Sequence, residues 1–345
     1  MLKRLASSVL LFLYALLLAC GECASVTIQN SKPRTDVKKN IIDAHDGSLL
    51  FHNGTYYLYG TPYGNGTGSS PDQLVYSYAV YSSDNLQDWV MESTDLLPNR
   101  PAGIYYRAHV RYNKKTQRFV LYYCWRKAIK PYSAWPYGNN KYGGTGVAVS
   151  SSPTGPFRIY NANVTLAMPS EYRGDFSLFV DDDVDETAYI IGTAGSMQTM
   201  SIERLTPDYL GSTLQSTGTS WGENYPAEAP VLFKRNGLYI AMFDTNCGFC
   251  KQGSGAAVHV SNVSALGPFV HTGRNINRFA NGTTIIKGQQ AGVWQMESTL
   301  VWVADLWQST PDGVKGHDLQ YWGPIEFDSQ GVPLPLKQVE SWTID

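Results

Sequence analysis

Apolar residues in this chain gather in short runs separated by turns, and these runs predict β-strands. Five runs of aromatic and aliphatic residues lie at 55–59, 119–125, 188–192, 238–243 and 300–303. Aromatic and β-branched residues favour strands. Each run follows a turn that another apolar run precedes, which is the pattern of a β-hairpin. The periodicity of an amphipathic helix is hard to find beyond the N-terminal segment.

The predicted hairpins recur along the chain, with turns near Gly54, Lys115, Asp183, Gly237 and Glu297. A spacing of about 60 residues indicates an internal repeat. Five units, each with room for four strands, match a five-bladed β-propeller. A β-sandwich would also supply regular strands, but it does not explain the repeat. No linker-like segment follows residue 40, so we expect an all-β protein with a single propeller domain over residues 41–345.

The first 24 residues have the layout of a secretory signal peptide. Lys3 and Arg4 form a basic start, residues 9–19 form an apolar core, and small residues before Ser25 offer a cleavage site. A membrane anchor is the alternative, but the apolar run is shorter than the ~20 residues that span a bilayer. We therefore expect a signal peptide at 1–24, a leader segment at 25–40 and a secreted, extracellular protein.

Composition narrows the partners of the predicted domain. The 27 lysines and arginines nearly balance 29 aspartates and glutamates, for a net charge of −2, so nothing suggests binding to a phosphate backbone. We expect no nucleic-acid or membrane partner, and a monomer.

Two further features fit secretion. Five Asn-x-Ser/Thr sequons, at Asn53, Asn65, Asn163, Asn262 and Asn281, predict a glycoprotein behind the signal peptide. Cys247 and Cys250 have the spacing of a small disulfide loop, with free thiols as the alternative. If the signal peptide is cleaved after Ala24, Cys20 and Cys23 are lost and no second Cys-x-x-Cys pair remains to complete a zinc site.

Counting eight residues back from each predicted turn reaches one residue per repeat: Asp46, Arg107, Asp175, Glu228 and Gln289. The innermost strands of a propeller surround a central channel, so equivalent positions on them converge at one end of it. The acidic members precede apolar runs that predict buried strands, which would hold the carboxylates on a rigid scaffold. Ordinary acidic residues at strand starts are the alternative interpretation.

Three carboxylates at one channel mouth suit hydrolysis of a glycosidic bond with inversion. Such an enzyme needs an ionised carboxylate that activates water and a protonated acid for the leaving oxygen, about 6.5–9.5 Å apart. A third carboxylate can keep the acid protonated by raising its pKa.

Several neighbouring residues are candidates for substrate contacts. His45 either touches substrate or forms hydrogen bonds inside the channel, and Arg107 can bind a sugar hydroxyl or pair with Asp175. Other candidate contacts are Tyr63, Tyr106, Trp125, Trp135, Tyr137, Trp221 and Gln289. The acidic run at 181–186 is interpreted as a solvated hairpin tip, because it lacks the spacing of calcium ligands.

The motifs around the three acids resemble those of glycoside hydrolase family 43, over most of the chain after about residue 40. Asp46 lies eight residues before Gly54, the first residue of a Gly-Thr-Tyr-Tyr-Leu-Tyr motif. Asp175 precedes Phe-Val-Asp-Asp-Asp, and Glu228 is the first residue of Glu-Ala-Pro. The resemblance implies a five-bladed propeller with Asp46 as general base and Glu228 as general acid. It implies that Asp175 tunes the pKa of the acid and orients the substrate.

Within this family the chain is similar to the exo-β-1,3-galactanase branch, through Ala44-His45, Tyr172-Arg173, Glu228-Ala-Pro230 and Gly288-Gln289. That branch has glutamine where other members place a metal-coordinating histidine. Gln289 therefore disfavours a central calcium ion, and we expect no metal and no cofactor.

Two departures from the branch leave the general base open between Asp46 and Gln289. The branch usually lacks the first Asp and is proposed to use the glutamine in its place, whereas Asp46 is present here. The branch also has Glu-Arg-Pro in the second repeat, where this chain has Tyr106-Arg107-Ala108.

The sequence thus predicts a secreted inverting glycosidase that acts on galactose-, arabinose- or xylose-containing polysaccharide. Exo-β-1,3-galactanase-like activity, that of a galactan 1,3-β-galactosidase, is the leading expectation. An arabinofuranosidase or xylosidase of the same family is one alternative. A propeller that binds carbohydrate without hydrolysing it is the other, motivated by the altered motif at 106–108.

Overall fold

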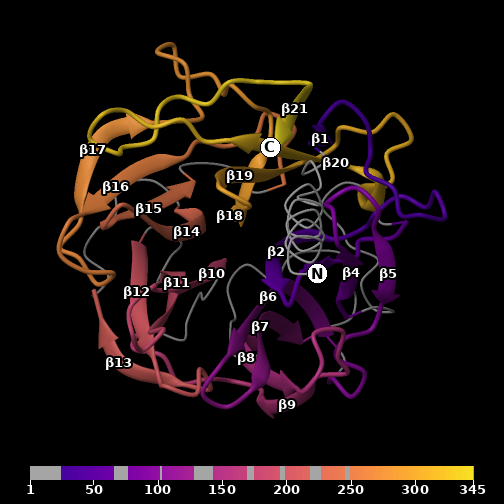
Figure 1. The fold of residues 1–345 in the computed structure, drawn as a ribbon, viewed down its shortest axis with the longest axis vertical. Helices are drawn as coiled ribbons and strands as arrows, with labels where there is room; N and C mark the ends of the chain where they lie inside the picture. Colours follow the sequence, from indigo (N-terminus) through magenta and orange to yellow (C-terminus); the bar gives the residue numbers. More distant parts are fainter. Residues whose placement is uncertain are drawn as a thin grey trace, which may run out of the picture.

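The protein folds as five antiparallel β-sheets arranged around a central axis, like the blades of a propeller (Figure 1). This computed structural model describes residues 25–65, 77–101, 103–127, 143–168, 175–194, 199–217, 227–244 and 249–344. The five predicted turns all lie in hairpins between the first two strands of a blade. The all-β, five-bladed propeller predicted from the sequence is confirmed, and the sandwich alternative is excluded.

Each blade is a meander whose first strand faces the axis. The first blade contains β2 (His45–His52), β3 (Thr55–Thr61), β4 (Ala79–Ser83) and β5 (Val90–Ser93). The second contains β6 (Gly103–Asn113), β7 (Arg118–Lys127), β8 (Gly143–Ser150) and β9 (Arg158–Asn161). The third contains β10 (Phe176–Val180), β11 (Ala188–Ala194), β12 (Thr199–Leu205) and β13 (Ser212–Ser216). The fourth contains β14 (Glu228–Arg235), β15 (Leu238–Asp244), β16 (Ala257–Ser261) and β17 (Val270–Asn275). The fifth contains β18 (Gln289–Met296), β19 (Thr299–Leu306) and β20 (Leu319–Pro324).

Local sequence explains the tightest of these hairpins. Asn53 and Gly54 form a two-residue turn with φ of 51° and 85°, and Asn236 and Gly237 repeat it with 49° and 80°. A two-residue hairpin of this type needs positive φ at both positions, which asparagine and glycine tolerate best. These turns therefore fix the register of the inner strands in two blades.

The two ends of the chain close the ring. β1 (Val26–Gln29) pairs with β21 (Ser341–Ile344), and both lie beside the fifth blade in Figure 1. The Asn30 side chain extends this closure, because it donates to the carbonyl of Trp322 and accepts from its amide, both at 2.9 Å. Residues that the sequence assigned to a leader segment thus form part of the propeller. A four-residue strand whose partner is at the other end of the chain carries no local signal of that pairing.

Apolar side chains fill the space between neighbouring blades. The five hydrophobic clusters each draw mainly on two adjacent blades; Leu58 and Trp322, for example, join the first and fifth blades in one cluster. This packing sets the positions of the inner strands and so of the residues at their ends. Among the described residues, no helix is long and apolar enough to cross a membrane.

Candidate active site

The inner strands are bulged where they begin, and the bulges direct polar side chains to one end of the channel. The register shifts between His45 and Ser48 in β2, and between Glu228 and Val231 in β14; β6 has the corresponding shift. A bulge of this kind re-aims a side chain. Position 47, inside the bulge of β2, must be glycine, because a Cβ there would lie 1.8 Å from the carbonyl oxygen of Tyr59.

The bulge residues Asp46, Arg107 and Ala229 have φ of 47°, 56° and 49°, a conformation that L-residues with side chains rarely adopt. Their amides are bound by carboxylates of the preceding blade. Asp46 N donates to Asp305 Oδ2 at 2.8 Å and Ala229 N donates to Asp175 Oδ2 at 3.1 Å, with a longer contact of 3.4 Å from Arg107 N to Asp46 Oδ1. These bonds compensate for the strained backbone and link blade to blade around the channel.

The strand register corrects the eight-residue count. Glu228 pairs with Asp244 and Gln289 with Asp305, as His45 pairs with Thr61, so Glu228 and Gln289 correspond to His45 rather than to Asp46. The count shifted because it started from the second residue of the Asn53-Gly54 turn, but from the first residue of the equally long turns at Asn236 and Glu297. The five residues still meet, as the contacts below show, since each bulge brings two successive positions to the same channel mouth.

Asp46 lies at the wall of the channel, with 7% of its surface exposed. Its carboxylate accepts hydrogen bonds from Thr61 Oγ1 at 2.6 Å and Tyr63 Oη at 2.9 Å. Burial raises the pKa of Asp46 to about 6, although the charge of Arg107 opposes that rise. A carboxylate with this pKa is ionised at neutral pH and remains basic enough to take a proton from water.

Asp175 and Arg107 form an ion pair beside Asp46. Arg107 Nη2 donates to Asp175 Oδ2 at 2.7 Å, and the arginine is 3% exposed whereas the Asp175 side chain is 27% exposed. Burial alone would lower the pKa of Arg107, but the charges of Asp175 and Asp46 raise it, so the guanidinium stays charged. Arg107 thus adopts the pairing alternative, and the side chain of Asp175 remains partly exposed.

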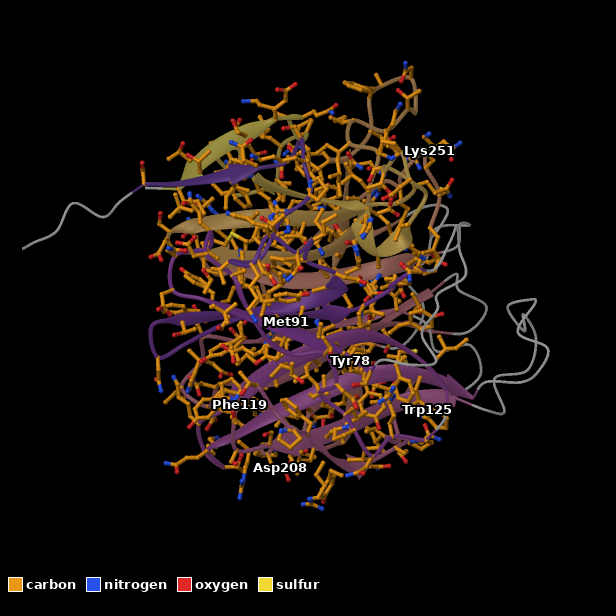
Figure 2. All side chains as sticks on the ribbon, turned by 90° about the vertical axis from the view of Figure 1, so that its right-hand side faces the viewer. Tyr78, Met91, Phe119, Trp125, Asp208 and Lys251 are labelled. Atoms are coloured by element: carbon orange, nitrogen blue, oxygen red, sulfur yellow. The ribbon has the colours of Figure 1, made fainter. Side chains whose placement is uncertain are left out.

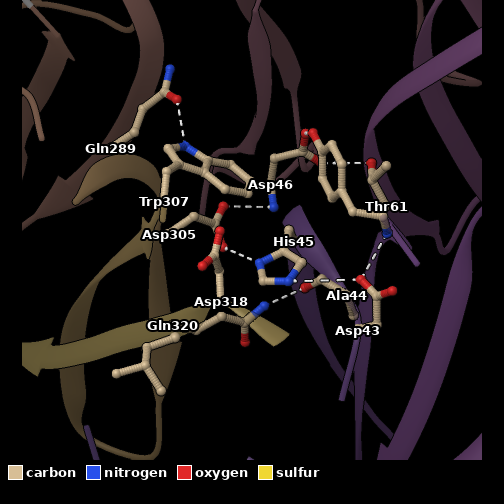
Figure 3. A network of polar contacts seen from close by, with 12 residues as sticks. Asp43, Ala44, His45, Asp46, Thr61, Gln289, Asp305, Trp307, Asp318 and Gln320 are labelled. Atoms are coloured by element: carbon tan, nitrogen blue, oxygen red, sulfur yellow. Dashed lines mark hydrogen bonds and ion pairs between the residues drawn. The ribbon is translucent and has the colours of Figure 1, made fainter. Parts of the chain in front are cut away.

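Glu228 and Gln289 meet on the opposite side of the site. Gln289 Nε2 donates to Glu228 Oε2 at 3.4 Å. The orientation of the amide is set by its oxygen, which accepts from Trp307 Nε1 at 2.8 Å and from Phe249 N at 3.1 Å; the first of these bonds is drawn in Figure 3. Both lone pairs of that oxygen are therefore used, and Gln289 does not fit the role of a cation ligand. Within the described ranges, no three His, Cys, Asp or Glu residues gather as a metal ion would require.

Two predicted substrate contacts lie beneath the site instead of facing it. His45 and Tyr63 are both 0% exposed. His45 Nδ1 bonds Asp305 Oδ1 at 2.9 Å and its Nε2 lies 3.7 Å from Asp43 Oδ1, as Figure 3 shows. His45 thus holds Asp305, whose other oxygen holds the amide of Asp46. Both residues support Asp46 from below.

The remaining predicted contacts differ in exposure. Tyr106 is 7% exposed, and Trp125 is half-buried, stacked on Tyr105 with its Nε1 bonded to Ala162 O at 2.7 Å. Figure 2 places Trp125 and Phe119 at opposite ends of the molecule, which puts Trp125 at the end of β7 that pairs with the start of β6. Trp125 is therefore the least buried of the described aromatic candidates. Trp135, Tyr137 and Trp221 lie outside the described residues, as do Tyr172, Arg173 and Cys247.

Sequence reasoning missed several residues that build the site, chiefly Asp305, Trp307 and Asp43. Asp305 and Trp307 directly follow the predicted strand at 300–303, where a hairpin partner of Gln289 must lie. Pairing that strand with the start of β18 would have found them. Asp43 accepts from the amides of Tyr63 and Gly64 at 2.8 and 2.7 Å, a contact with no sequence motif.

The charge on His45 should make the stability of the protein depend on pH. Burial alone would lower its pKa, but the hydrogen bond and charge of Asp305, with Asp43 and Asp318, raise it to about 9. The unfolded chain has a histidine pKa of about 6.5. The stabilisation is therefore complete below about pH 6.5 and is lost as pH rises through 9, a change on the order of 3 kcal/mol. Urea unfolding should show the free-energy difference between wild type and His45→Asn shrinking from pH 6 to pH 9.5; a constant difference would contradict a charged His45.

Comparisons with known proteins agree with this architecture. Residues 38–323 match the model of glycosyl hydrolases family 43. Three solved structures are similar in fold. A family 43 β-1,3-galactosidase with galactodeoxynojirimycin has a TM-score of 0.76 and 24% identity, over 91% of this chain and 99% of that one. A second β-1,3-galactosidase of the family has a TM-score of 0.73 and 23% identity, over 92% and 63%. An exo-β-1,3-galactanase variant from Phanerochaete chrysosporium with β-1,3-galactotriose has a TM-score of 0.73 and 22% identity, over 92% of this chain and 68% of that one.

The chain thus spans 63% of the length of one of these proteins and nearly all of another. No curated protein sequence matches it. At these identities the structural likeness establishes the fold, and the family match rests on the sequence itself. Because that match covers most of the propeller and all five residues of the channel mouth, the chain belongs to glycosyl hydrolase family 43.

Proposed function

We propose that this protein is a secreted, inverting exo-β-1,3-galactanase that releases galactose from the end of a β-1,3-linked galactan. The observation that carries the proposal is the contact between Gln289 and Glu228. Glutamine at this position is one of the features through which the sequence is similar to the galactanase branch. The names of the similar structures, β-1,3-galactosidases and exo-β-1,3-galactanases, support the same substrate class.

The proposed reaction assigns one role to each acid. Glu228 donates its proton to the glycosidic oxygen as the bond to the anomeric carbon breaks. A water molecule attacks that carbon from the opposite face and gives its proton to Asp46, so the product has inverted configuration. Asp175 binds both Arg107 and the amide of Ala229 and thereby positions the strand that carries Glu228.

Secretion is part of the proposal. The signal-like segment at 1–24 supports it, and so do the five sequon asparagines, all of which are exposed: Asn53, Asn65, Asn163, Asn262 and Asn281. Cys250 is disulfide-bonded, as an oxidising compartment permits.

A hydrolysis screen tests the substrate. The purified protein is incubated with β-1,3-galactan, arabinan and xylan, and products are resolved by chromatography and by proton NMR of the newly released anomer. We expect galactose from β-1,3-galactan alone, appearing first as the α-anomer. Release of arabinose or xylose would instead identify the family's arabinofuranosidase or xylosidase activity. Binding of galacto-oligosaccharides without hydrolysis of any substrate would make the protein a carbohydrate-binding propeller.

A further inference from the structure

Lys315 is a buried cation at the base of the site that the proposed mechanism does not use. It opens a short 3-10 helix (Lys315–His317) before β20, and 2% of its surface is exposed. Among the described residues, its Nζ has no hydrogen-bond partner. Instead it lies 3.7 Å from the ring centre of Phe249, 4.0 Å from that of Tyr63 and 4.4 Å from that of Trp307. The ammonium is therefore held by three aromatic faces, here called the Lys315 cage.

Residues of the Lys315 cage donate hydrogen bonds to both candidate bases. Tyr63 Oη donates to Asp46 at 2.9 Å. Trp307 Nε1 and Phe249 N donate to Gln289 at 2.8 and 3.1 Å. The rings also contact one another, with centres 5.1 to 6.3 Å apart. One cation thus contacts the ring of Tyr63, which donates to Asp46, and the ring of Trp307, which donates to Gln289.

A cation over an aromatic face acts on the ring in two ways. It attracts the π-electrons and so holds the ring in place, more strongly where water is excluded. It also withdraws electron density from the ring, so that a phenol O–H or an indole N–H on that ring becomes a stronger donor. A charged Lys315 should therefore fix the geometry of the bonds to Asp46 and Gln289 and strengthen them.

The charges around Lys315 explain why this buried lysine can carry a proton. Burial lowers its pKa to about 7, whereas the carboxylates of Asp46, Asp305, Asp318 and Asp43 favour the charged form. Tyr63, whose buried phenol stays neutral, lies against Lys315, and the ring of the charged His45 contacts the Tyr63 ring, with centres 5.7 Å apart. A lysine of this kind changes charge near neutral pH.

We propose that Lys315 is a positioning residue: through the Lys315 cage, its ammonium holds Asp46 and Gln289 in the orientation that the attack of water requires. This inference rests on the proposed function for its effect on turnover, while its structural core can be tested without a substrate.

The kinetic test compares Lys315→Met, which fills the cage without charge, with Lys315→Arg, which keeps the charge. We expect Lys315→Met to lower kcat on β-1,3-galactan about tenfold or more, to leave KM within about threefold, and to shift the pH profile; Lys315→Arg should recover part of kcat. Lys337→Met, which removes an exposed lysine paired with Glu326, is the matched control with unchanged kinetics. A wild-type kcat and pH profile in Lys315→Met would overturn the proposal.

An NMR titration separates this inference from the proposed function. The indole N–H resonance of Trp307, assigned by its loss in Trp307→Phe, should shift with pH around the pKa of Lys315 in wild type. That titration should disappear in Lys315→Met while the other indole resonances keep their positions. If the protein fails to hydrolyse galactan but this Lys315-dependent titration is present, the Lys315 cage is supported and the proposed function is rejected. An identical Trp307 titration in wild type and Lys315→Met would reject the cage, whatever the activity.

Discussion

Replacing Glu228 with glutamine should lower hydrolysis of β-1,3-galactan by about 10²–10⁴-fold, the range that general acid catalysis usually contributes. The amide fills the space of the carboxyl and can keep its contact with Gln289, but it cannot protonate the leaving oxygen. The measurement is kcat on the polysaccharide, with binding of galacto-oligosaccharides by calorimetry as the test of an intact site. We expect binding within a few-fold of wild type.

The leaving group provides a sharper test of the same assignment. The leaving group of a nitrophenyl galactoside is a stable phenolate that departs without protonation. Glu228→Gln should therefore be much less impaired on this substrate than on galactan. Glu326→Gln, an exposed carboxylate that pairs with Lys337, is the control and should match wild type on both substrates. An equal loss on both substrates would give Glu228 a role other than the acid, and near-normal turnover of galactan would remove it from the mechanism.

Replacing Asp46 with asparagine should lower kcat by a similar 10²–10⁴-fold and change the pH profile. The base must be ionised, and burial raises the pKa of Asp46 to about 6, so wild-type kcat/KM should fall as pH drops below about 6. Asparagine can still accept from Thr61 and Tyr63, so the loss reports the charge rather than a collapsed site. In the residual activity of Asp46→Asn, this acidic limb should be absent.

Gln289→Ala distinguishes the two candidate bases. Gln289 carries no titrating proton in this range, so its removal should leave the acidic limb at about pH 6 in place if Asp46 is the base. Asp46→Asn with wild-type activity, combined with an inactive Gln289→Ala, would move the role of the base to the glutamine. The pair therefore decides a question that the sequence left open.

Sequence predicted the fold well because its signals are local. The Asn53-Gly54 and Asn236-Gly237 turns and the apolar runs beside them define hairpins, and five hairpins at regular spacing define the propeller. The acids could be located approximately because they begin buried strands. The offset at Glu228 arose because the count began at Gly54, the second residue of one two-residue turn, but at Asn236, the first residue of the other. No residue type marks the bulges in the sequence, because non-glycine residues such as Asp46 and Arg107 occupy the left-handed region there.

The supporting residues could not be predicted because their partners are distant in sequence. His45 contacts Asp305 across 260 positions, and Tyr63 and Lys315 meet across a similar span. The sequence predicts Tyr63 as a substrate contact and leaves His45 open between a substrate contact and a hydrogen-bonded channel residue. A polar or aromatic residue beside a catalytic acid gives the same signal whether it faces solvent or the core. Burial, which only the folded ring determines, separates the two cases.

The bonds from carboxylates to bulge amides have a consequence for how the molecule fails. Asp305, Asp46 and Asp175 each fasten one blade to the next through a single backbone N–H. A force or mutation that parts one of these three pairs of blades therefore pulls on a catalytic or supporting acid. Loss of activity should be the earliest sign that these blades separate, because the residues of the active site also connect one blade to the next.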